Sequence, residues 1–295
     1  MDRLKYYVVD VFADSKYAGN QLAVFRNAGS LSTEMMQRIA FEINYSETTF
    51  ISTDSERDGG YDVRIFTPRH EVPFAGHPTL GTAFIIQNKI VQQSVEKVQL
   101  NLKAGQIPVT FSYKDNRADI LFMRQLSPTF GEKLDVNVIA EILSIGVDSF
   151  DSHFPTQEVS TGFPFIIAPL TNIEALKQCR VNSEKYFDLI NKLDSKAILV
   201  FSPETHETGN DLSVRVFVEY FGIPEDPATG SANGCLAGYL VEHRYFDSDR
   251  IDIKVEQGYE IDRPSLLYLK AERSKDGIII DVGGKVVMVA EGEFV

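Results

Sequence analysis

The spacing of apolar residues predicts many short strands and only a few helices. Runs of about four to eight residues rich in β-branched and aromatic side chains favour strands, and apolar residues at helical spacing favour helices. The expected strands are residues 6–12, 21–25, 62–66, 95–102, 107–113, 118–123, 165–168, 197–201, 214–218, 251–255, 265–271, 278–282 and 286–289. The expected helices are one that Ser32 caps and residues 78–90, 136–145, 184–193 and 231–243.

One pattern occurs twice, in residues 64–86 and again in residues 215–240. Each copy opens with a β-type V-R-[IV]-F run and passes through a Pro-rich loop to P-x-x-G. A run of small and apolar residues follows, and because it is apolar nearly all round, it predicts a buried helix. A pattern that recurs in this way indicates one architectural unit used twice.

Strands outnumber helices in each half, and each half has one helix apolar enough to be enclosed. We therefore expect an α+β fold of two pseudo-symmetric domains, each a curved, mostly antiparallel sheet or barrel around a central helix. The expected domains are residues 1–124 and 125–284, with the polar Pro/Gly segment 127–135 as the linker. The active cleft is expected between the halves, where ligands often bind.

The junction between loop and helix predicts an anion site in each copy. A helix start presents unpaired backbone N–H groups and the positive end of the helix dipole, which together attract carboxylates and phosphates. Gly76, Gly230 and Ser231 stand at these two helix starts, and together with Ser46 they are the expected substrate-binding residues. The alternative is that each Gly-Pro loop merely begins a helix.

Three residues are candidates for acid–base chemistry. Glu47 follows Ser46 in a hydroxyl-rich turn, where partial desolvation raises a carboxyl pKa toward the range useful for proton transfer. His77 follows the glycine of the first helix start, where it could donate to a substrate oxygen or stabilise a developing enolate. Asp226 precedes the second helix start, where it could bind a substrate amine or a proton. The alternatives are an exposed glutamate, a helix-cap histidine and a capping aspartate.

Composition restricts the class of partner and the compartment. The net charge of −13 argues against nucleic acid or an anionic membrane as the partner. Two cysteines, Cys179 and Cys235, are too few for a disulfide framework and suit a reducing compartment. Residues 1–5 lead into no apolar leader, and no apolar run reaches the roughly 18 residues of a membrane span. We therefore expect a cytoplasmic protein.

Several common site patterns are missing from the sequence. The five histidines show no H-E-x-x-H and no paired Cys/His spacing, so we expect no metal. Residues 230–238 lack the glycine spacing and the context of a dinucleotide site. Neither a G-x-x-x-x-G-K-[ST] phosphate loop nor a G-x-S-x-G nucleophile motif occurs. The expected chemistry uses no cofactor.

Six motifs in order resemble those of the phenazine-biosynthesis PhzF-like isomerase family. They span essentially the whole chain, which makes their joint match specific. They are D-V-F…G-N-Q-L-A-V-F (10–25), N-Y-S-E-T-T-F (44–50), R-I-F-T-P…E-V-P-F-A-G-H-P-T-L-G (64–81), S-T-G-F-P (160–164), E-D-P-A-T-G-S-A (225–232) and Q-G-Y-E-I-D-R-P-S (257–265).

The resemblance implies a diaminopimelate-epimerase-like fold, often a homodimer, in which residues 285–295 return to the first domain. It also implies a reaction, because the best-understood member of the family isomerises trans-2,3-dihydro-3-hydroxyanthranilate without a cofactor. The acid–base glutamate of that member falls on Glu47. Its supporting histidine, aspartate and serine fall on His77, Asp226 and Ser231.

The resulting hypothesis is a cofactor-independent isomerase that moves a proton between carbons of a small carboxylate. Other proteins of this fold use two thiols, one at each helix start, but those positions here hold His77 and Ser231, with Cys235 a turn deeper. Two alternatives stay open: a catalytically silent binding or scaffold protein, and an epimerase of a different small acid.

Overall fold

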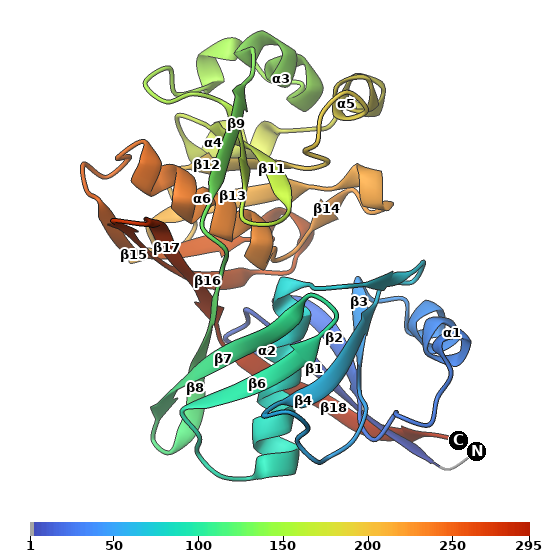
Figure 1. Ribbon diagram of the computed structural model, residues 1–295. Coiled ribbons are helices and arrows are strands. Elements are labelled where there is room, and N and C mark those ends of the chain that lie inside the picture. Colours follow the sequence, from blue (N-terminus) through green and yellow to red (C-terminus); the bar gives the residue numbers. More distant parts are fainter. Residues whose placement is uncertain (1–2) are drawn as a thin grey trace. The chain divides into compact units, whose positions relative to one another are not determined.

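The computed structural model describes residues 3–295, and the chain divides into two compact units. Unit 1 runs as far as Arg124 and takes in Gly283–Val295, whereas unit 2 comprises Gln125–Val282. The last strand therefore belongs with the first one, and Figure 1 shows the red C-terminal strand beside the blue N-terminal strand. Residues 1 and 2, where the search for a leader began, lie outside the described residues.

Unit 1 is a curved sheet with one helix through its centre and one on its outside (Figure 1). Its strands are β1 (Leu4–Val11), β2 (Asn20–Phe25), β3 (Glu47–Ile51), β4 (Tyr61–Phe66), β5 (Glu71–Val72), β6 (Lys97–Leu102), β7 (Gly105–Lys114), β8 (Arg117–Arg124) and β18 (Val286–Phe294). Its helices are the outer α1 (Thr33–Ile43) and the central α2 (Gly76–Ile85), which continues as the π-helical η1 (Ile86–Val91).

Unit 2 repeats this plan with more helices on the outside. Its strands are β9 (Thr129–Lys133), β10 (Gln157–Ser160), β11 (Pro164–Pro169), β12 (Ile198–Ser202), β13 (Leu212–Phe217), β14 (Glu225–Asp226), β15 (Arg250–Gln257), β16 (Ser265–Ser274) and most of β17 (Gly277–Gly284). Its helices are α3 (Val136–Leu143), α4 (Ile173–Gln178), α5 (Ser183–Ile190) and the central α6 (Gly230–Glu242). The short 3-10 turns η2 (Val147–Ser149), η3 (Glu219–Phe221) and η4 (Tyr259–Ile261) complete it.

Strand pairing follows the same scheme in both units. Most pairs are antiparallel, but β2–β3 and β4–β6 in unit 1 are parallel, as are β11–β12 and β13–β15 in unit 2. A parallel pair needs a crossover connection, usually a helix. Helix α1 joins β2 to β3, and α4 with α5 joins β11 to β12. The internal repeat of the sequence is thus a repeat of sheet topology.

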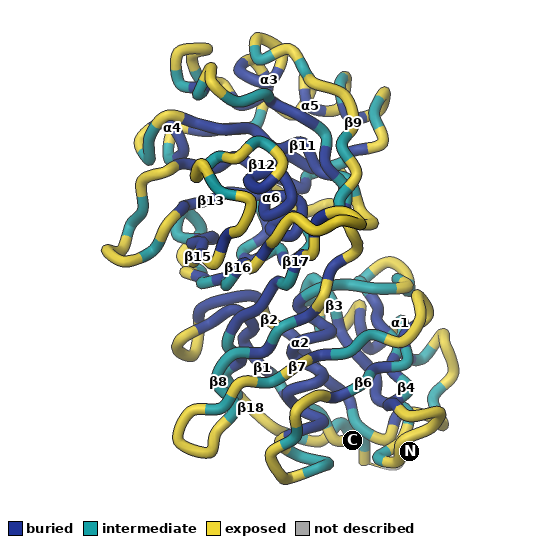
Figure 2. The backbone as a smooth tube through the Cα atoms, turned by 60° about the vertical axis from the view of Figure 1, so that its left-hand side comes forward, coloured by how far each residue is buried: buried dark blue, intermediate teal, exposed yellow. Residues whose placement is uncertain are grey.

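The two central helices are buried because their sequences carry small and apolar residues on every side. Helix α2 packs against β1, β2, β3, β6, β7, β8 and β18, and α6 packs against β10, β11, β15 and β16. At Gly81 of α2, a side-chain Cβ would come within 2.6 Å of Leu22 and 2.9 Å of Val11, so a larger residue would force these side chains to move. Figure 2 shows both helices in dark blue, enclosed by their own unit.

A second core lies between each sheet and its outer helices. In unit 1, Met36, Ile39 and Ala40 of α1 cover the aromatic side chains of Phe25 and Phe50. In unit 2, the buried residues of α3, α4 and α5 form one cluster with those of β11 and β12. Each unit therefore has a complete hydrophobic core of its own, which is the condition for an independently stable domain.

The α+β fold class predicted from the sequence is confirmed, and so is the strand–loop–buried helix order of both copies. The linker prediction is wrong for most of residues 127–135, because β9 lies there and pairs antiparallel with β10. Its residues are mostly exposed and polar, so a strand at the rim of the sheet looked like a loop. The sequence also gave no sign of β10 or α4, which are only four and six residues long.

Candidate active site

Strand register makes the two repeat copies equivalent residue by residue. Val72 on β5 lies opposite Ile65 of β4, and Asp226 on β14 lies opposite Val216 of β13. Four residues after Val72, and four after Asp226, a glycine begins the central helix. The two helix starts are therefore built in the same way, and the differences between them are differences of side chain.

Both central helices begin without a side-chain cap. The N-cap residues Ala75 of α2 and Thr229 of α6 make no capping hydrogen bond from their side chains. The outer helices α1, α3, α4 and α5 all do, through Ser32, Asp135, Asn172 and Asn182. No acidic residue lies in the first turn of α2 or α6. These two helix starts keep the positive character that favours an anion.

The structure brings Glu47 and His77 together in unit 1. Glu47 is the first residue of β3 and follows the half-buried Ser46, and His77 is the second residue of α2, directly after Gly76. Glu47 Oε2 lies 3.5 Å from His77 Nε2, with side-chain exposures of 20% and 7% respectively. The carboxyl group is thus partly desolvated and reaches the start of the central helix.

His77 is a neutral imidazole. Burial lowers its pKa to about 3, because the charged ring would lose its hydration, and the hydrogen bond with the Gln21 backbone offsets this only in part. The positive end of α2 also disfavours a cation there. Among the residues that the structure describes, Nε2 makes no hydrogen bond, and it is this nitrogen that faces Glu47.

The position of its single proton decides what His77 can do. A neutral ring has one N–H and one nitrogen with a lone pair. With the proton on Nε2, His77 could donate to a substrate oxygen, as predicted from the sequence. With the lone pair on Nε2, it could accept a hydrogen bond from the protonated form of Glu47, whose Oε2 lies 3.5 Å away.

The other predicted residues lie in unit 2. Asp226 ends β14 with 8% exposure, and Thr229 Oγ1 donates a hydrogen bond to its Oδ2 at 2.5 Å. Gly230 is buried and Ser231 is half-buried, and they are the first two residues of α6. Unit 1 thus groups Ser46, Glu47, Gly76 and His77, and unit 2 groups Asp226, Gly230 and Ser231.

Sequence reasoning missed the polar residues that surround Asp226. Gln257 of β15 donates from Nε2 to the Asp226 carbonyl at 2.8 Å and to Thr229 Oγ1 at 3.0 Å. Asn233 donates to Gln257 Oε1 at 2.9 Å. The hydroxyl of Thr229, three residues after Asp226, was a local signal within E-D-P-A-T-G. Gln257 opens the motif at 257–265, but nothing in that motif indicated a contact with Asp226, which lies 31 residues earlier in the chain.

Neither cysteine offers a thiolate at a helix start. Cys235 lies one turn into α6, fully buried, with Sγ 3.6 Å from Thr161 Oγ1. Cys179 is fully buried beside the Ala175 carbonyl. Burial raises the pKa of each thiol to about 12, since an anion is disfavoured in the core. Both therefore serve as packing residues.

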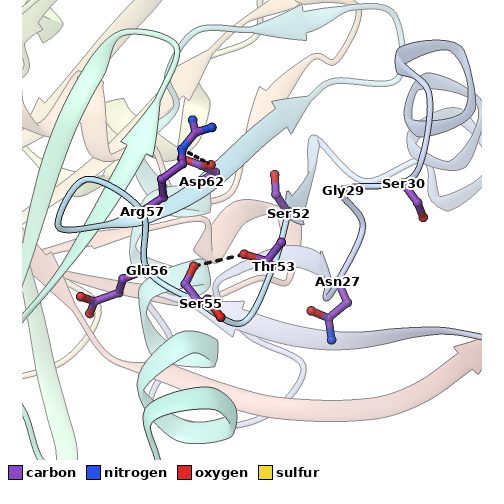
Figure 3. Close-up of a pocket in the computed structure, with 9 residues that line it drawn as sticks. All are labelled: Asn27, Gly29, Ser30, Ser52, Thr53, Ser55, Glu56, Arg57 and Asp62. Carbon is purple, nitrogen blue, oxygen red and sulfur yellow. Dashed lines mark hydrogen bonds and ion pairs between the residues drawn. The ribbon is translucent and has the colours of Figure 1, made fainter.

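The surface of unit 1 carries a polar hollow apart from these residues (Figure 3). Its volume is about 730 Å³, and Asn27, Gly29, Ser30, Ser52, Thr53, Ser55, Glu56, Arg57 and Asp62 line it. The Arg57 guanidinium forms an ion pair with Asp62, with Nε 3.0 Å from Oδ2. A neighbouring hollow of about 570 Å³ shares Ser52, Arg57 and Asp62. No predicted site residue lines either hollow.

Two further kinds of feature can be assessed over residues 3–295, namely metal centres and membrane-spanning helices. In this range, no three His, Cys, Asp or Glu side chains gather so that they could hold a metal ion. No helix in the same range has the length and apolar character needed to cross a membrane. The central helix α6, for example, has 13 residues, against the roughly 20 that a membrane-spanning helix needs.

Comparison with known proteins identifies the family. The family model described as phenazine biosynthesis-like protein (PhzC-PhzF) matches residues 9–292. A trans-2,3-dihydro-3-hydroxyanthranilate isomerase of Pseudomonas aeruginosa is 33% identical over 290 residues, which cover 98% of each chain. Both matches extend over nearly the whole chain, in agreement with the resemblance found in its motifs.

Comparison with solved structures agrees with this family assignment. A phenazine biosynthesis protein of the PhzF family from Bacillus anthracis superposes with a TM-score of 0.91 at 26% identity, covering 100% of both chains. A hydroxyproline epimerase of Agrobacterium vitis reaches a TM-score of 0.65 at 8% identity, covering 100% of this chain and 91% of the other, which shows the fold alone. The chain therefore belongs to the phenazine biosynthesis-like (PhzF) family and is an isomerase.

Proposed function

We propose that this isomerase moves a proton between two carbons of a small carboxylate substrate, without a cofactor, and that Glu47 is both its base and its acid. The observation that carries the proposal is the contact between Glu47 and the neutral His77 at the uncapped start of α2. A partly buried carboxyl beside a hydrogen-bond acceptor is suited to hold a proton between two transfer steps. The relatives named as isomerases support the reaction class.

The proposed reaction conserves atoms and electrons. Glu47 removes a proton from a carbon next to an unsaturated or carboxyl-activated system, and the electron pair of the broken C–H bond shifts the double bond. Glu47 then returns the proton to a different carbon. While Glu47 is protonated, its O–H can donate to His77 Nε2, which lies 3.5 Å away. Nothing is oxidised and no group is lost, so neither an electron acceptor nor a second substrate is needed.

The remaining predicted residues have binding roles in this proposal. In each unit separately, the start of the central helix can attract negative charge of the substrate: the backbone N–H groups at Gly76 in unit 1, and those at Gly230 together with Ser231 in unit 2. Asp226 takes a substrate amine or a proton. The missing side-chain caps on α2 and α6 support this, because caps on these helices would occupy the same N–H groups.

The first substrate to test is trans-2,3-dihydro-3-hydroxyanthranilate, because it is the substrate named for several relatives. The reaction should be run in D₂O with added chelator and followed by proton NMR. We expect a shifted double bond, with deuterium at the newly protonated carbon to the extent that solvent reaches Glu47 during the reaction. A panel of small cyclic amino acids and hydroxy acids should be run in parallel to detect an epimerase of another acid.

The same panel tests the alternative of a silent binding protein. That protein would be stabilised against heat by a ligand but would leave it chemically unchanged and unlabelled. Thermal stabilisation without turnover or deuterium incorporation, across the whole panel, would contradict the proposed activity. Turnover that disappears with chelator and returns with a metal ion would contradict cofactor independence.

A further inference from the structure

We propose that Gln257 is a positioning residue that, through Thr229, holds Asp226 in its carboxylate form. The proposal rests on the proposed function in one respect, namely that Asp226 belongs to the substrate site. Gln257 is 1% exposed, and its amide group makes hydrogen bonds to three residues around the start of α6.

The orientation of the Gln257 amide follows from two backbone groups, one of which can only donate a hydrogen bond and the other only accept one. The backbone N–H of Thr229 can only donate, so the atom 3.1 Å from it is the oxygen, Oε1. The carbonyl of Asp226 can only accept, so the atom 2.8 Å from it is the nitrogen, Nε2. A flipped amide would place two donors together at one end and two acceptors together at the other.

This orientation bears on where the Thr229 proton lies. Gln257 Nε2 uses one hydrogen for the Asp226 carbonyl and directs the other to Thr229 Oγ1 at 3.0 Å. The threonine hydroxyl thus accepts a hydrogen bond from Gln257 and donates its own proton to Asp226 Oδ2. A hydrogen bond donated to a carboxylate stabilises its charged form. The chain of bonds therefore favours an ionised Asp226.

The first repeat copy shows that the turn does not need these side chains. Val72 and Ala75 stand there at the positions of Asp226 and Thr229. Continuing the parallel registers of β4–β6 and β13–β15 places Leu102 at the position of Gln257. All three positions are apolar in the first copy, yet the same strand, loop and helix form. The polar set in the second copy therefore has a task beyond making the fold.

That task is not helix capping. A capping side chain accepts from a backbone N–H of the first turn, but the hydroxyl of Thr229 makes no such bond and donates to Asp226 instead. The backbone around it is held separately, since Asn233 donates to the Thr229 carbonyl at 3.1 Å and Ser265 donates to the Pro227 carbonyl at 2.9 Å. What Thr229 and Gln257 add is the charge state and direction of one carboxylate.

The test follows the Asp226 carboxyl carbon by NMR in ¹³C-aspartate-labelled full-length protein, with Asp226→Asn to assign the signal. The parent is compared over pH with Thr229→Ala, which copies the first repeat copy, and with Thr229→Ser, which keeps the hydroxyl. We expect Asp226 to titrate at a higher pH in Thr229→Ala and as in the parent in Thr229→Ser. Gln257→Leu should also raise its titration, because the hydroxyl proton is then free to turn away.

Ser265→Ala is the matched control, because Ser265 is buried and donates its hydrogen bond to the backbone of the same loop, at the Pro227 carbonyl. It should leave the Asp226 titration unchanged. Loss of one hydrogen bond to a charged group changes an equilibrium constant by about tenfold or more. In Thr229→Ala, kcat/KM for trans-2,3-dihydro-3-hydroxyanthranilate should therefore fall about tenfold or more. In Thr229→Ser it should recover.

Two outcomes separate this inference from the proposed function. If Asp226 titrates alike in the parent, Thr229→Ala and Gln257→Leu, the inference is wrong, whatever the activity. If the titration shifts as expected but Asp226→Asn retains full turnover, the hydrogen-bond chain is correct and the role of Asp226 in the reaction is not. Should Gln257→Leu fail to fold, Gln257→Met takes its place, because it keeps the length of the side chain but cannot donate to Thr229.

Discussion

The ion pair between Arg64 and Glu71 in unit 1 has a counterpart between Arg215 and Glu225 in unit 2. Both are two-pronged, with N···O distances of 2.8 and 2.9 Å in the first and 3.0 and 2.7 Å in the second. Each guanidinium also lies over the phenylalanine two residues further on, 5.0 Å from the ring centre in one unit and 4.8 Å in the other. Both copies of the repeat thus have the same ion pair, which joins the strand to the loop that follows it. We call each of these ion pairs a clasp.

The two clasps differ in their surroundings. The side chains of Arg64 and Glu71 are 31% and 18% exposed, and Arg64 also donates to Thr33 at the start of α1. Arg215 and Glu225 are only 6% and 5% exposed, and Arg215 also donates to two backbone carbonyls at the end of α4. The second pair is part of a core, whereas the first lies at its edge.

The larger difference concerns chemistry. Strand register places Ala197 of unit 2 at the position of Glu47, and Ser231 at the position of His77. Conversely, Asp226 stands where unit 1 has Val72. The candidate base therefore exists in one copy only. A mechanism with one equivalent base in each half has no residues to use, which favours a single glutamate that both takes and returns the proton.

The largest effect should come from removing that base. Glu47→Gln keeps the size of the side chain and its hydrogen-bonding capacity but cannot accept the proton, so turnover should fall by about 10²-fold or more. Substrate should still bind nearly as in the parent. Steady-state kinetics combined with ligand-induced thermal stabilisation measures both quantities.

The exposed Glu56→Gln serves as the control for the loss of one negative charge on unit 1. Asp226→Asn gives the comparison with the second copy. If Glu47→Gln turns over within a few-fold of the parent while Asp226→Asn is inactive, the base is Asp226. The copies would then have exchanged roles relative to our assignment.

The two ion pairs should differ strongly in what they contribute to stability. Breaking a buried pair leaves an uncompensated charge and costs about 3–5 kcal/mol, which is the loss expected for Arg215→Met, because Glu225 stays buried. Breaking an exposed pair costs about 1 kcal/mol or less, which is closer to Arg64→Met. Denaturant unfolding of the two variants beside the parent measures the difference. Equal losses would show that burial does not separate the two clasps.

The fold class and most of the strands and helices could be predicted from the sequence, and the two repeat copies show why. The central helices are apolar on every side, and the strands before them have strong β character, so local pattern and tertiary environment agree. Strand β9 was not readable, because it lies at the rim of its sheet with polar, exposed residues and a glycine. Its strand character comes from pairing with β10, which is a tertiary effect.

The candidate site was readable only as a set of residues. The motifs and the resemblance led to Glu47, His77, Asp226 and the helix starts, but not to how they are held. The low pKa of His77 depends on its burial, and the backbone carbonyl of Asp226 is bonded by Gln257 from a distant strand. No local pattern encodes such contacts between strands, and only the folded chain reveals them.

His77, which has no titrating counterpart at Ser231, should make stability depend on pH. Its folded pKa of about 3 lies below the roughly 6.5 of an unfolded histidine. Below pH 6.5 the unfolded chain therefore binds a proton that the folded chain does not, and stability falls as the pH falls, by up to about 1.4 kcal/mol per pH unit. Between pH 6.5 and 5, this amounts to about 2 kcal/mol.

His77→Asn should remove this part of the pH dependence, because asparagine can still donate to Gln21 but does not titrate. Denaturant unfolding between pH 5 and 7.5 compares the variant with the parent, and His153→Asn, at an exposed side chain, is the matched control. NMR of the His77 ring nitrogens gives an independent reading. A protonated ring at pH 6 would contradict both the neutral state and the acceptor role.

The smallest effect should come from the thiols, and it again separates the two copies. Cys235 of α6 stands where α2 has Gly81, five residues after each helix begins, so it fills space that the first copy leaves to Leu22 and Val11. Cys179→Ala with Cys235→Ala should leave turnover within a few-fold of the parent, because neither buried thiol ionises near neutral pH. Each change should cost on the order of 1 kcal/mol of stability, through lost packing. Cys235→Ser separates lost packing from thiol chemistry, since it nearly keeps the shape of the side chain but places a hydroxyl beside Thr161. This variant should bind and turn over substrate like the alanine variant. A folded double variant that binds substrate but has lost turnover would restore the thiol mechanism and end the case for a single glutamate.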